Sequence, residues 1–253
     1  MKLFLRALAL FCALTSGLAS GVAHAAEVRV AVAANFSAPM QKIAAEFAAD
    51  TGHTAVLSLG STGKLFAQVR NGAPFQVLLA ADADTPARLE AQGLAQAGTR
   101  FTYATGRLVL WSKQAGLVDA KGEVLRTGTF AHIALADPKL APYGAAAFQT
   151  LEKLGLLQSL QSRMVQGESI AQAYQFVATG NAALGFVALA QVTADGRLTE
   201  GSAWVVPDNL HAPIRQDAVL LTQGRDAPAA LALMAYLKGD KARKIMQSFG
   251  YGL

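Results

Sequence analysis

The chain has 253 residues, of which 53% are hydrophobic and 15% charged, and its 22 lysines and arginines exceed its 17 aspartates and glutamates. This length and apolar content suit one large hydrophobic core or two modest ones. The basic residues form no run, which argues against a nucleic-acid-binding protein, and the single cysteine, Cys12, excludes an internal disulfide.

The first 25 residues have the pattern of a secretory signal peptide. A short basic start (residues 1–6) precedes an apolar run (residues 7–14), and Ala23-His24-Ala25 matches a small-residue cleavage site. A membrane anchor is the alternative, but the apolar run is too short to cross about 30 Å of hydrocarbon. Residues 1–25 are therefore predicted to be removed on export to the periplasm, which leaves a mature chain without cysteine.

The mature chain begins with a strand that runs into a helix. Valines alternate over residues 28–32, as in a strand, and apolar residues then follow at helical spacing over residues 40–47. Ser37 is predicted to cap this helix, Pro39 to lie in its first turn, and Gly52 to end it. The start of such a helix leaves backbone N–H groups without partners.

Strand and helix patterns alternate along the rest of the chain. Strands are expected at residues 55–59, 75–80, 101–111, 131–136, 184–189, 205–206 and 219–221, and helices at residues 61–70, 87–92, 145–154, 169–178, 228–237 and 240–249. This order predicts an α/β protein with parallel sheets.

The domain organisation follows from two extended segments at which the chain can cross between lobes. These segments are Thr105-Gly106 and His211-Ala212-Pro213. Crossings at these points predict one lobe from residues 26–106 plus 214–253 and a second lobe from residues 107–213.

The sequence offers little evidence for catalysis or for a metal site. The mature histidines, His53, His132 and His211, lack the spacing of a zinc site. Gly60-Ser61-Thr62-Gly63 fits neither a nucleophile elbow nor a phosphate-binding P-loop. Asp82 and Asp84 could form a carboxylate pair, but the stronger interpretation is that Asp84 caps the next helix.

One arrangement recurs: a strand, a short polar turn and the start of a helix. It appears at residues 35–37, 60–63 and 142–144, and more loosely at residues 167–170. Each copy alone is more typical of an ordinary helix start. Several helix N-termini that converge on one cleft would, however, bind a small anion through N–H groups and neutral side-chain donors.

These segments resemble the periplasmic molybdate-binding proteins of ABC transporters, a branch of the type II solute-binding proteins. The resemblance rests on the segments AANFSAPM (33–40), GSTGKLFAQVRNGAPFQVLLAAD (60–82), FTYATGRLVLWS (101–112), ALADPKLAPYGAAA (134–147) and LGFVALAQV (184–192). It implies a two-lobed periplasmic-binding-protein fold in which each lobe is a mostly parallel sheet flanked by helices.

The resemblance also implies a site for a tetrahedral oxyanion between the lobes. Carried over by position, the oxyanion-binding residues are Ala34, Asn35, Ser61, Thr62, Tyr143 and Ile170. Ala34 and Ile170 could serve only through their backbone, and Tyr143 is expected to take the role of a tyrosine that some relatives carry at the position of Ala188. Molybdenum would be held only as part of the oxyanion, with no protein atom bonded to it.

The function implied by the resemblance is the capture of molybdate or tungstate by a monomer that delivers the anion to an ABC permease. No cofactor, catalysis or nucleic acid is expected. The alternatives are a binding protein for another oxyanion such as sulfate, an enzyme of the same fold that uses Asp82 and Asp84, and a sensor module that regulates a partner. A site without charged residues suits anions that carry no proton, whereas phosphate near neutral pH carries one and calls for an acceptor.

Overall fold

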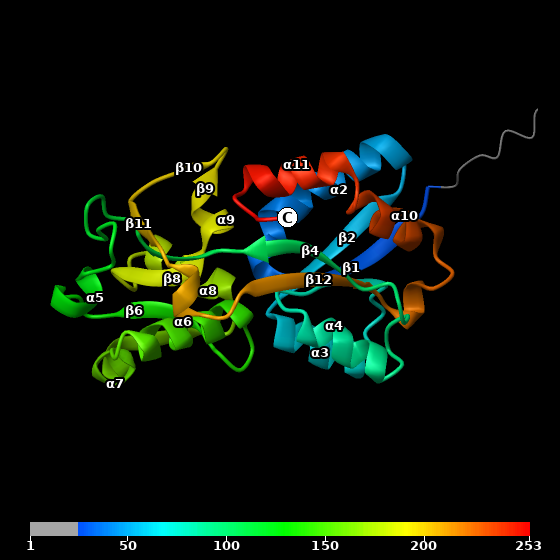
Figure 1. The fold of residues 1–253 in the computed structure, drawn as a ribbon. Coiled ribbons are helices and arrows are strands. Elements are labelled where there is room, and N and C mark those ends of the chain that lie inside the picture. The colour runs from blue at the N-terminus through cyan, green and yellow to red at the C-terminus, as the bar shows by residue number, and fades with distance from the viewer. Residues whose placement is uncertain (1–24) are drawn as a thin grey trace, which may run out of the picture.

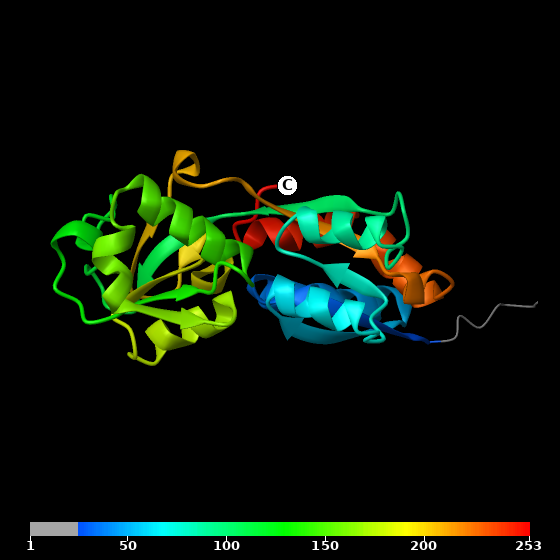
Figure 2. The same ribbon diagram turned by 90° about the horizontal axis from the view of Figure 1, so that it is seen from below.

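The computed structural model describes residues 25–253, and the predicted signal peptide lies outside the described residues except for Ala25. The described chain forms two five-stranded sheets that lie side by side, each with helices on both faces (Figures 1 and 2). The expected α/β fold with two lobes is confirmed.

The first sheet has the strand order β2-β1-β3-β12-β4. Its strands are β1 (Glu27–Ala33), β2 (Thr54–Gly60), β3 (Val77–Leu79), β4 (Phe101–Gly106) and β12 (Ile214–Leu220). β1 pairs in parallel with β2 and β3, whereas β12 pairs antiparallel with both β3 and β4. Four of the five strands therefore point the same way, and β12 alone is reversed.

Helices cover both faces of this sheet (Figure 1). They are η1 (Ala34–Phe36), α2 (Ser37–Thr51), α3 (Thr62–Arg70), α4 (Asp84–Ala91), η4 (Thr222–Gly224), α10 (Pro228–Tyr236) and α11 (Asp240–Ser248). The alternation of β1 decides which face each side chain covers: Val28, Val30 and Val32 pack with α2, α10 and α11, and Ala31 packs with α3 and α4 on the other face.

The second sheet repeats this plan with the strand order β11-β5-β8-β6-β7. Its strands are β5 (Leu108–Ser112), β6 (Ile133–Ala136), β7 (Met164–Gly167), β8 (Leu184–Ala188) and β11 (Ser202–Val205). β6 pairs in parallel with β7 and β8, whereas β5 pairs antiparallel with β8 and β11. Here β5 is the one reversed strand.

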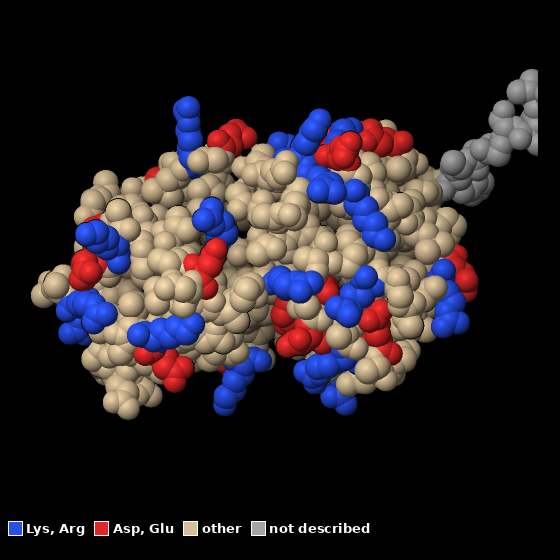
Figure 3. All heavy atoms as spheres, in the orientation of Figure 1, with Lys and Arg blue, Asp and Glu red and all other residues tan. Residues whose placement is uncertain are grey.

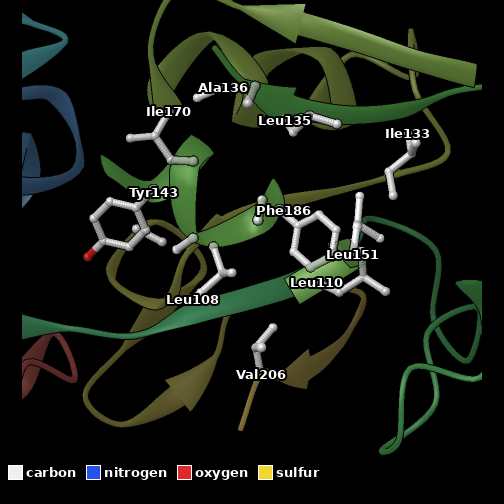
Figure 4. Close-up of a cluster of buried hydrophobic side chains, with 14 of the residues drawn as sticks. Leu108, Leu110, Ile133, Leu135, Ala136, Tyr143, Leu151, Ile170, Phe186 and Val206 are labelled. Carbon is white, nitrogen blue, oxygen red and sulfur yellow. The ribbon is translucent and has the colours of Figure 1, made fainter. Parts of the chain in front are cut away.

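The helices of the second sheet enclose a core that also includes Ala33, Ala34 and Ala81 at the strand ends of the first sheet. They are α5 (Val124–Thr127), α6 (Pro142–Lys153), α7 (Leu157–Leu160), η2 (Gln161–Arg163), α8 (Ile170–Ala178), α9 (Leu189–Val192) and η3 (Asp208–Leu210), and a small hairpin joins β9 (Thr193–Ala194) to β10 (Arg197–Leu198). Leu110, Leu135 and Phe186 lie at the centre of this core, and Tyr143 lies at its edge with its hydroxyl pointing away from it (Figure 4).

The chain passes between the two sheets twice. β4 ends at Gly106 and β5 begins at Leu108, while β11 ends at Val205 and β12 begins at Ile214. In both cases the strand that follows the passage is the reversed strand of the sheet it enters. β4 and β12 pair from Gly106 and Ile214 onward, so both passages lie next to each other in space (Figure 1).

Two predicted helix caps are wrong. Ser37 is the first residue of α2 rather than its cap, because the turn η1 precedes the helix and Phe36 takes the N-cap position. Asp84 is likewise inside α4, and it is Asp82 whose carboxylate accepts hydrogen bonds from the backbone N–H and the hydroxyl of Thr85. The predicted helix end at Gly52 is confirmed, with a φ of 74°.

Strand prediction failed where polar residues interrupt the apolar pattern. β12 begins five residues earlier than predicted. The polar residues Arg215, Gln216 and Asp217 interrupt the apolar pattern from which the strand was predicted. The edge strand β7 was not predicted at all, and the expected extended segment at residues 101–111 proves to be β4 and β5, which belong to different sheets.

No helix within residues 25–253 is long and apolar enough to cross a bilayer. On the face shown in Figure 3, lysines and arginines alternate with aspartates and glutamates over both sheets, and no area of a single charge stands out.

Candidate functional site

A small cavity lies between the two sheets, at the carboxyl ends of several strands, with about 10 Å³ of space for the centre of a water molecule. The structure brings all six predicted oxyanion-binding residues together around it: Ala34, Asn35, Ser61, Thr62, Tyr143 and Ile170. The other lining residues are Ala33, Ala81, Ala141 and Pro142. The first sheet contributes the ends of β1, β2 and β3, and the second contributes the starts of α6 and α8. Ligands of open α/β sheets bind at such strand ends.

The helix starts around the cavity supply backbone N–H groups. Thr62 is the first residue of α3, Tyr143 the second residue of α6, and Ile170 the first residue of α8. N–H groups in the first turn of a helix have no partner within the helix and carry partial positive charge. Three helices from two sheets therefore direct positive helix ends at one small space.

Ser61 adds a side chain without a partner. Ser61 is 4% exposed, and its hydroxyl is buried without a hydrogen-bond partner among the described residues. It occupies the N-cap position of α3 but makes no side-chain cap hydrogen bond. An unpaired buried hydroxyl costs about 1–3 kcal/mol in folding free energy, so its presence at the cavity indicates a site for a polar ligand.

The hydroxyl of Thr62 is fixed by one hydrogen bond. Its Oγ1 accepts from the backbone N–H of Ala81, over 3.0 Å. That bond uses an acceptor position of the hydroxyl and leaves its single proton for another partner. Ser61 and Thr62 thus offer two neighbouring O–H donors beside the N–H groups.

The side chain of Asn35 does not lie as the sequence suggested. Its Nδ2 donates to Gln216 Oε1 over 2.8 Å and to the hydroxyl of Tyr251 over 3.0 Å. Both N–H bonds of the amide are used within the protein, because these buried acceptors need donors. The donor that Asn35 retains for an anion is its backbone N–H.

The hydroxyl of Tyr143 is held by a hydrogen bond that it accepts, which does not use its own proton. Its oxygen accepts from Gln216 Nε2 over 3.2 Å. Gln216, Tyr103 and Tyr251 therefore stand behind the cavity as functional residues that the sequence analysis missed. Gln216 lies outside the strand predicted at residues 219–221, and nothing in the sequence near it indicates its distant partners.

The tyrosines of this cluster are neutral. Burial raises the pKa of Tyr103, Tyr143 and Tyr251. None of the ten cavity-lining residues is lysine, arginine, histidine, aspartate or glutamate. The site and the cluster behind it therefore have hydrogen-bond donors and no formal charge.

The carboxylates considered for catalysis do not converge on the cavity. Asp82 is held by Thr85 at the start of α4, and burial raises the pKa of its carboxyl, while Asp84 is exposed. Neither residue lines the cavity. Within the described part of the chain, no cluster of histidine, cysteine, aspartate and glutamate could hold a metal ion.

Two contacts close the space between the sheets near α3. The backbone N–H of Gly63 donates to the carbonyl of Leu140 over 2.9 Å. Lys64 Nζ lies 2.8 Å from Glu168 Oε1, and both side chains are 51% exposed. Each contact joins an element of the first sheet to a loop of the second.

Comparison with known proteins gives close matches over nearly the whole chain. Residues 28–252 match the family described as "Bacterial extracellular solute-binding protein". Molybdate-binding protein ModA of Azotobacter vinelandii is 59% identical over 96% of this chain and 97% of its own, and ModA of Rhodobacter capsulatus is 49% identical over 98% and 96%. The solved structure of the Azotobacter vinelandii periplasmic molybdate-binding protein superposes with a TM-score of 0.87, at 44% identity over 89% of this chain and 99% of that one.

Proposed function

Because the chain belongs to the bacterial extracellular solute-binding protein family, we propose that it captures molybdate between its two lobes and delivers it to an ABC permease. The similarity to the two ModA proteins supports this substrate. The relatives that match nearly the whole chain are binding proteins for molybdate, which supports a transport protein and not an enzyme.

One observation carries the proposal: the buried hydroxyl of Ser61 has no partner among residues 25–253, and it lies at a cavity onto which three helix starts converge. Such a site is complementary to an anion that accepts hydrogen bonds on every oxygen. Molybdate, tungstate and sulfate are dianions of this kind. The proposed contacts are the N–H groups of Ala34, Asn35, Thr62, Tyr143 and Ile170 together with the hydroxyls of Ser61, Thr62 and Tyr143.

The neutral site also gives selectivity against phosphate. Near neutral pH phosphate carries a proton, and no carboxylate lines the cavity to accept it in preference to the donors that surround the anion. The unpaired donor would cost about 1–3 kcal/mol. Sulfate has the right charge but shorter bonds to oxygen, so it reaches fewer donors of a fixed ring at once. Tungstate matches molybdate in charge and size and should bind similarly.

The organisation of the chain follows from the same proposal. Residues 26–106 with 214–253 form one lobe and residues 107–213 the other. Residues 1–25 are removed on export, and the mature protein acts in the periplasm as a monomer. Binding of one anion by donors from both lobes favours the closed form by the contacts that only this form makes.

The test is calorimetric titration of the exported protein with molybdate, tungstate, sulfate and phosphate at pH 6.5, 7.5 and 8.5. Molybdate should bind more tightly than sulfate and phosphate, with nearly constant affinity, because no group of the proposed site titrates in this range. Sulfate binding as tightly as molybdate would favour the alternative of a sulfate-binding protein. A steep dependence of the molybdate affinity on pH would contradict the all-neutral site.

A further inference from the structure

Gln216 is a fully buried polar residue that lies outside the cavity lining. It belongs to β12, the strand that follows the second passage between the sheets. The pairing of β12 with β4 is irregular between Gln216 and Asp217, where Tyr103 of β4 has no opposite residue. Such irregularities redirect side chains, and here the hydroxyl of Tyr103 reaches Gln216 Oε1 over 3.1 Å.

The two ends of the Gln216 amide contact different sheets. Its Oε1 accepts from Asn35 of the first sheet over 2.8 Å, and its Nε2 donates to Tyr143 of the second sheet over 3.2 Å. Asn35 and Tyr143 both line the cavity. An acceptor on one side and a donor on the other is a combination that an amide provides and that neither a carboxylate nor an alkyl chain does.

Gly106 makes this contact between the sheets feasible. A Cβ at residue 106 would lie 2.0 Å from the hydroxyl of Tyr143 and 2.6 Å from Gln216 Nε2. Only glycine leaves room there, at the last residue of β4 before the chain enters the second sheet. The amide therefore spans the two sheets directly beside the passage between them.

We propose that Gln216 is a positioning residue that fixes Asn35 relative to Tyr143 and so couples the shape of the anion site to closure of the two lobes. The inference rests on the proposed function. Its amide holds the backbone at Asn35 and the start of α6 in the arrangement in which their N–H groups meet the same anion. It does so without a charge, which would otherwise repel a dianion or leave an unpaired ion in the closed form.

The experiment compares Gln216→Met and Gln216→Glu with the unmodified exported protein by calorimetry with sodium molybdate. Gln216→Met keeps the approximate length of the side chain but loses its hydrogen bonds, and its affinity should fall about 10-fold at every pH. Gln216→Glu places a carboxylate behind the site. Above the pKa of that carboxylate, the affinity should fall by up to about tenfold per pH unit.

Proton uptake gives a readout that a merely structural role would not produce. Binding of a dianion near a buried carboxylate favours its protonated form, which again has one donor and one acceptor. Molybdate binding to Gln216→Glu should therefore take up protons, measured by calorimetry in buffers of different ionisation enthalpy, whereas binding to the unmodified protein should not. Gln76→Glu is the matched control, because the side-chain oxygen of Gln76 accepts from the backbone N–H of Arg29 and a glutamate can do the same.

The possible outcomes separate this inference from the proposed function. If the unmodified protein fails to bind molybdate, the function is wrong. If the unmodified protein binds molybdate and both Gln216 variants bind it with the same affinity as the unmodified protein at pH 6.5 and at pH 8.5, the inference is overturned. Should Gln216→Glu not fold, a double-mutant cycle of Gln216→Met with Tyr143→Phe decides: losses of affinity that multiply independently contradict the coupling, and a combined loss at least about threefold smaller than their product supports it.

Discussion

At the scale of single residues, Ser61 separates binding from stability most cleanly. Its hydroxyl has no partner in the described protein, so Ser61→Ala removes a buried unpaired group. The ligand-free protein should be as stable as the unmodified one or more stable. Molybdate affinity should fall about 10- to 150-fold, because a hydrogen bond to a charged group contributes about 1.5–3 kcal/mol. Thermal unfolding and calorimetry measure the two effects.

Ser58→Ala is the matched control for this substitution. Ser58 lies on β2, three residues before Ser61 and outside the cavity lining. Its replacement should leave the affinity for molybdate unchanged. Equal affinities of Ser61→Ala and Ser58→Ala would show that the hydroxyl of Ser61 does not contact the anion.

The sequence predicted the lining of the cavity but not the residues behind it. Ser61, Thr62 and Ile170 stand at helix starts after strands, a local pattern that short segments reveal. Gln216 meets Asn35 across 181 residues of chain and Tyr143 across 73. No local pattern records such contacts, and this is why the amide of Asn35 was expected to face the anion when it is turned to the protein.

At the scale of elements, the start of helix α4 is capped by Asp82 and not by Asp84, the residue for which this role was predicted. Asp82 accepts the N–H of Thr85 over 2.7 Å, whereas Asp84 is the first residue of the helix. Asp82→Ala should therefore destabilise the protein by about 1 kcal/mol, as the loss of a helix cap does. Asp84→Ala, the matched control, removes only the interaction of a charge with the helix start, worth about 0.3–1 kcal/mol. Urea denaturation at pH 7 compares the two, and a larger effect for Asp84→Ala would show that Asp84 is the residue that caps α4.

The same carboxyl gives a dependence of stability on pH. Burial raises the pKa of Asp82 in the folded chain above the ordinary 3.8. The protonated form is therefore favoured by folding, and this contribution is complete below about pH 3.8 and lost as the pH rises through the raised value. Asp82→Asn can keep the hydrogen bond from Thr85 without a titratable group. Its free energy of unfolding relative to the unmodified protein should increase from pH 4 to pH 7, as measured by urea denaturation, and a constant difference would contradict the shift.

The elements that the sequence predicted well are those with unbroken apolar patterns. β1, α2 and β6 appeared near their expected bounds, since their buried positions repeat at the period of a strand or a helix. β12 was cut short because its first residues are polar and are buried by contacts with distant parts of the chain. The extended segment Thr105-Gly106, predicted as a crossing between the lobes, lies at the end of β4, directly before the chain enters the second sheet.

At the scale of the whole molecule, the structure has the contacts of a closed form. Gly63 donates to Leu140 across the two sheets, and Gln216 donates to Tyr143 beside the passages. We expect small-angle scattering to show a smaller radius of gyration in saturating molybdate than in its absence, because the anion adds contacts only in the closed form. The control is sulfate at a concentration too low to fill the site, which shows the effect of a dianion in solution on the radius of gyration. Identical scattering with and without bound molybdate would mean that the lobes are closed already.

The ion pair between Lys64 and Glu168 tests how closure is divided between the anion and the protein surface. Both side chains are 51% exposed, so the pair should contribute no more than about 1 kcal/mol and should weaken with salt. Lys64→Ala and Glu168→Ala should each lower molybdate affinity at most about fivefold at low ionic strength, and the difference from the unmodified protein should largely disappear at about 1 M sodium chloride. The double variant should lose no more affinity for molybdate than either single variant, since each single substitution already removes the ion pair.

Calorimetry at both salt concentrations measures these affinities, with Lys42→Ala on the exposed side of α2 as the control for a lost positive charge. A loss that persists at high salt for Lys64→Ala alone would instead indicate that the ammonium group acts on the anion itself, and the neutral character of the site would have to be abandoned.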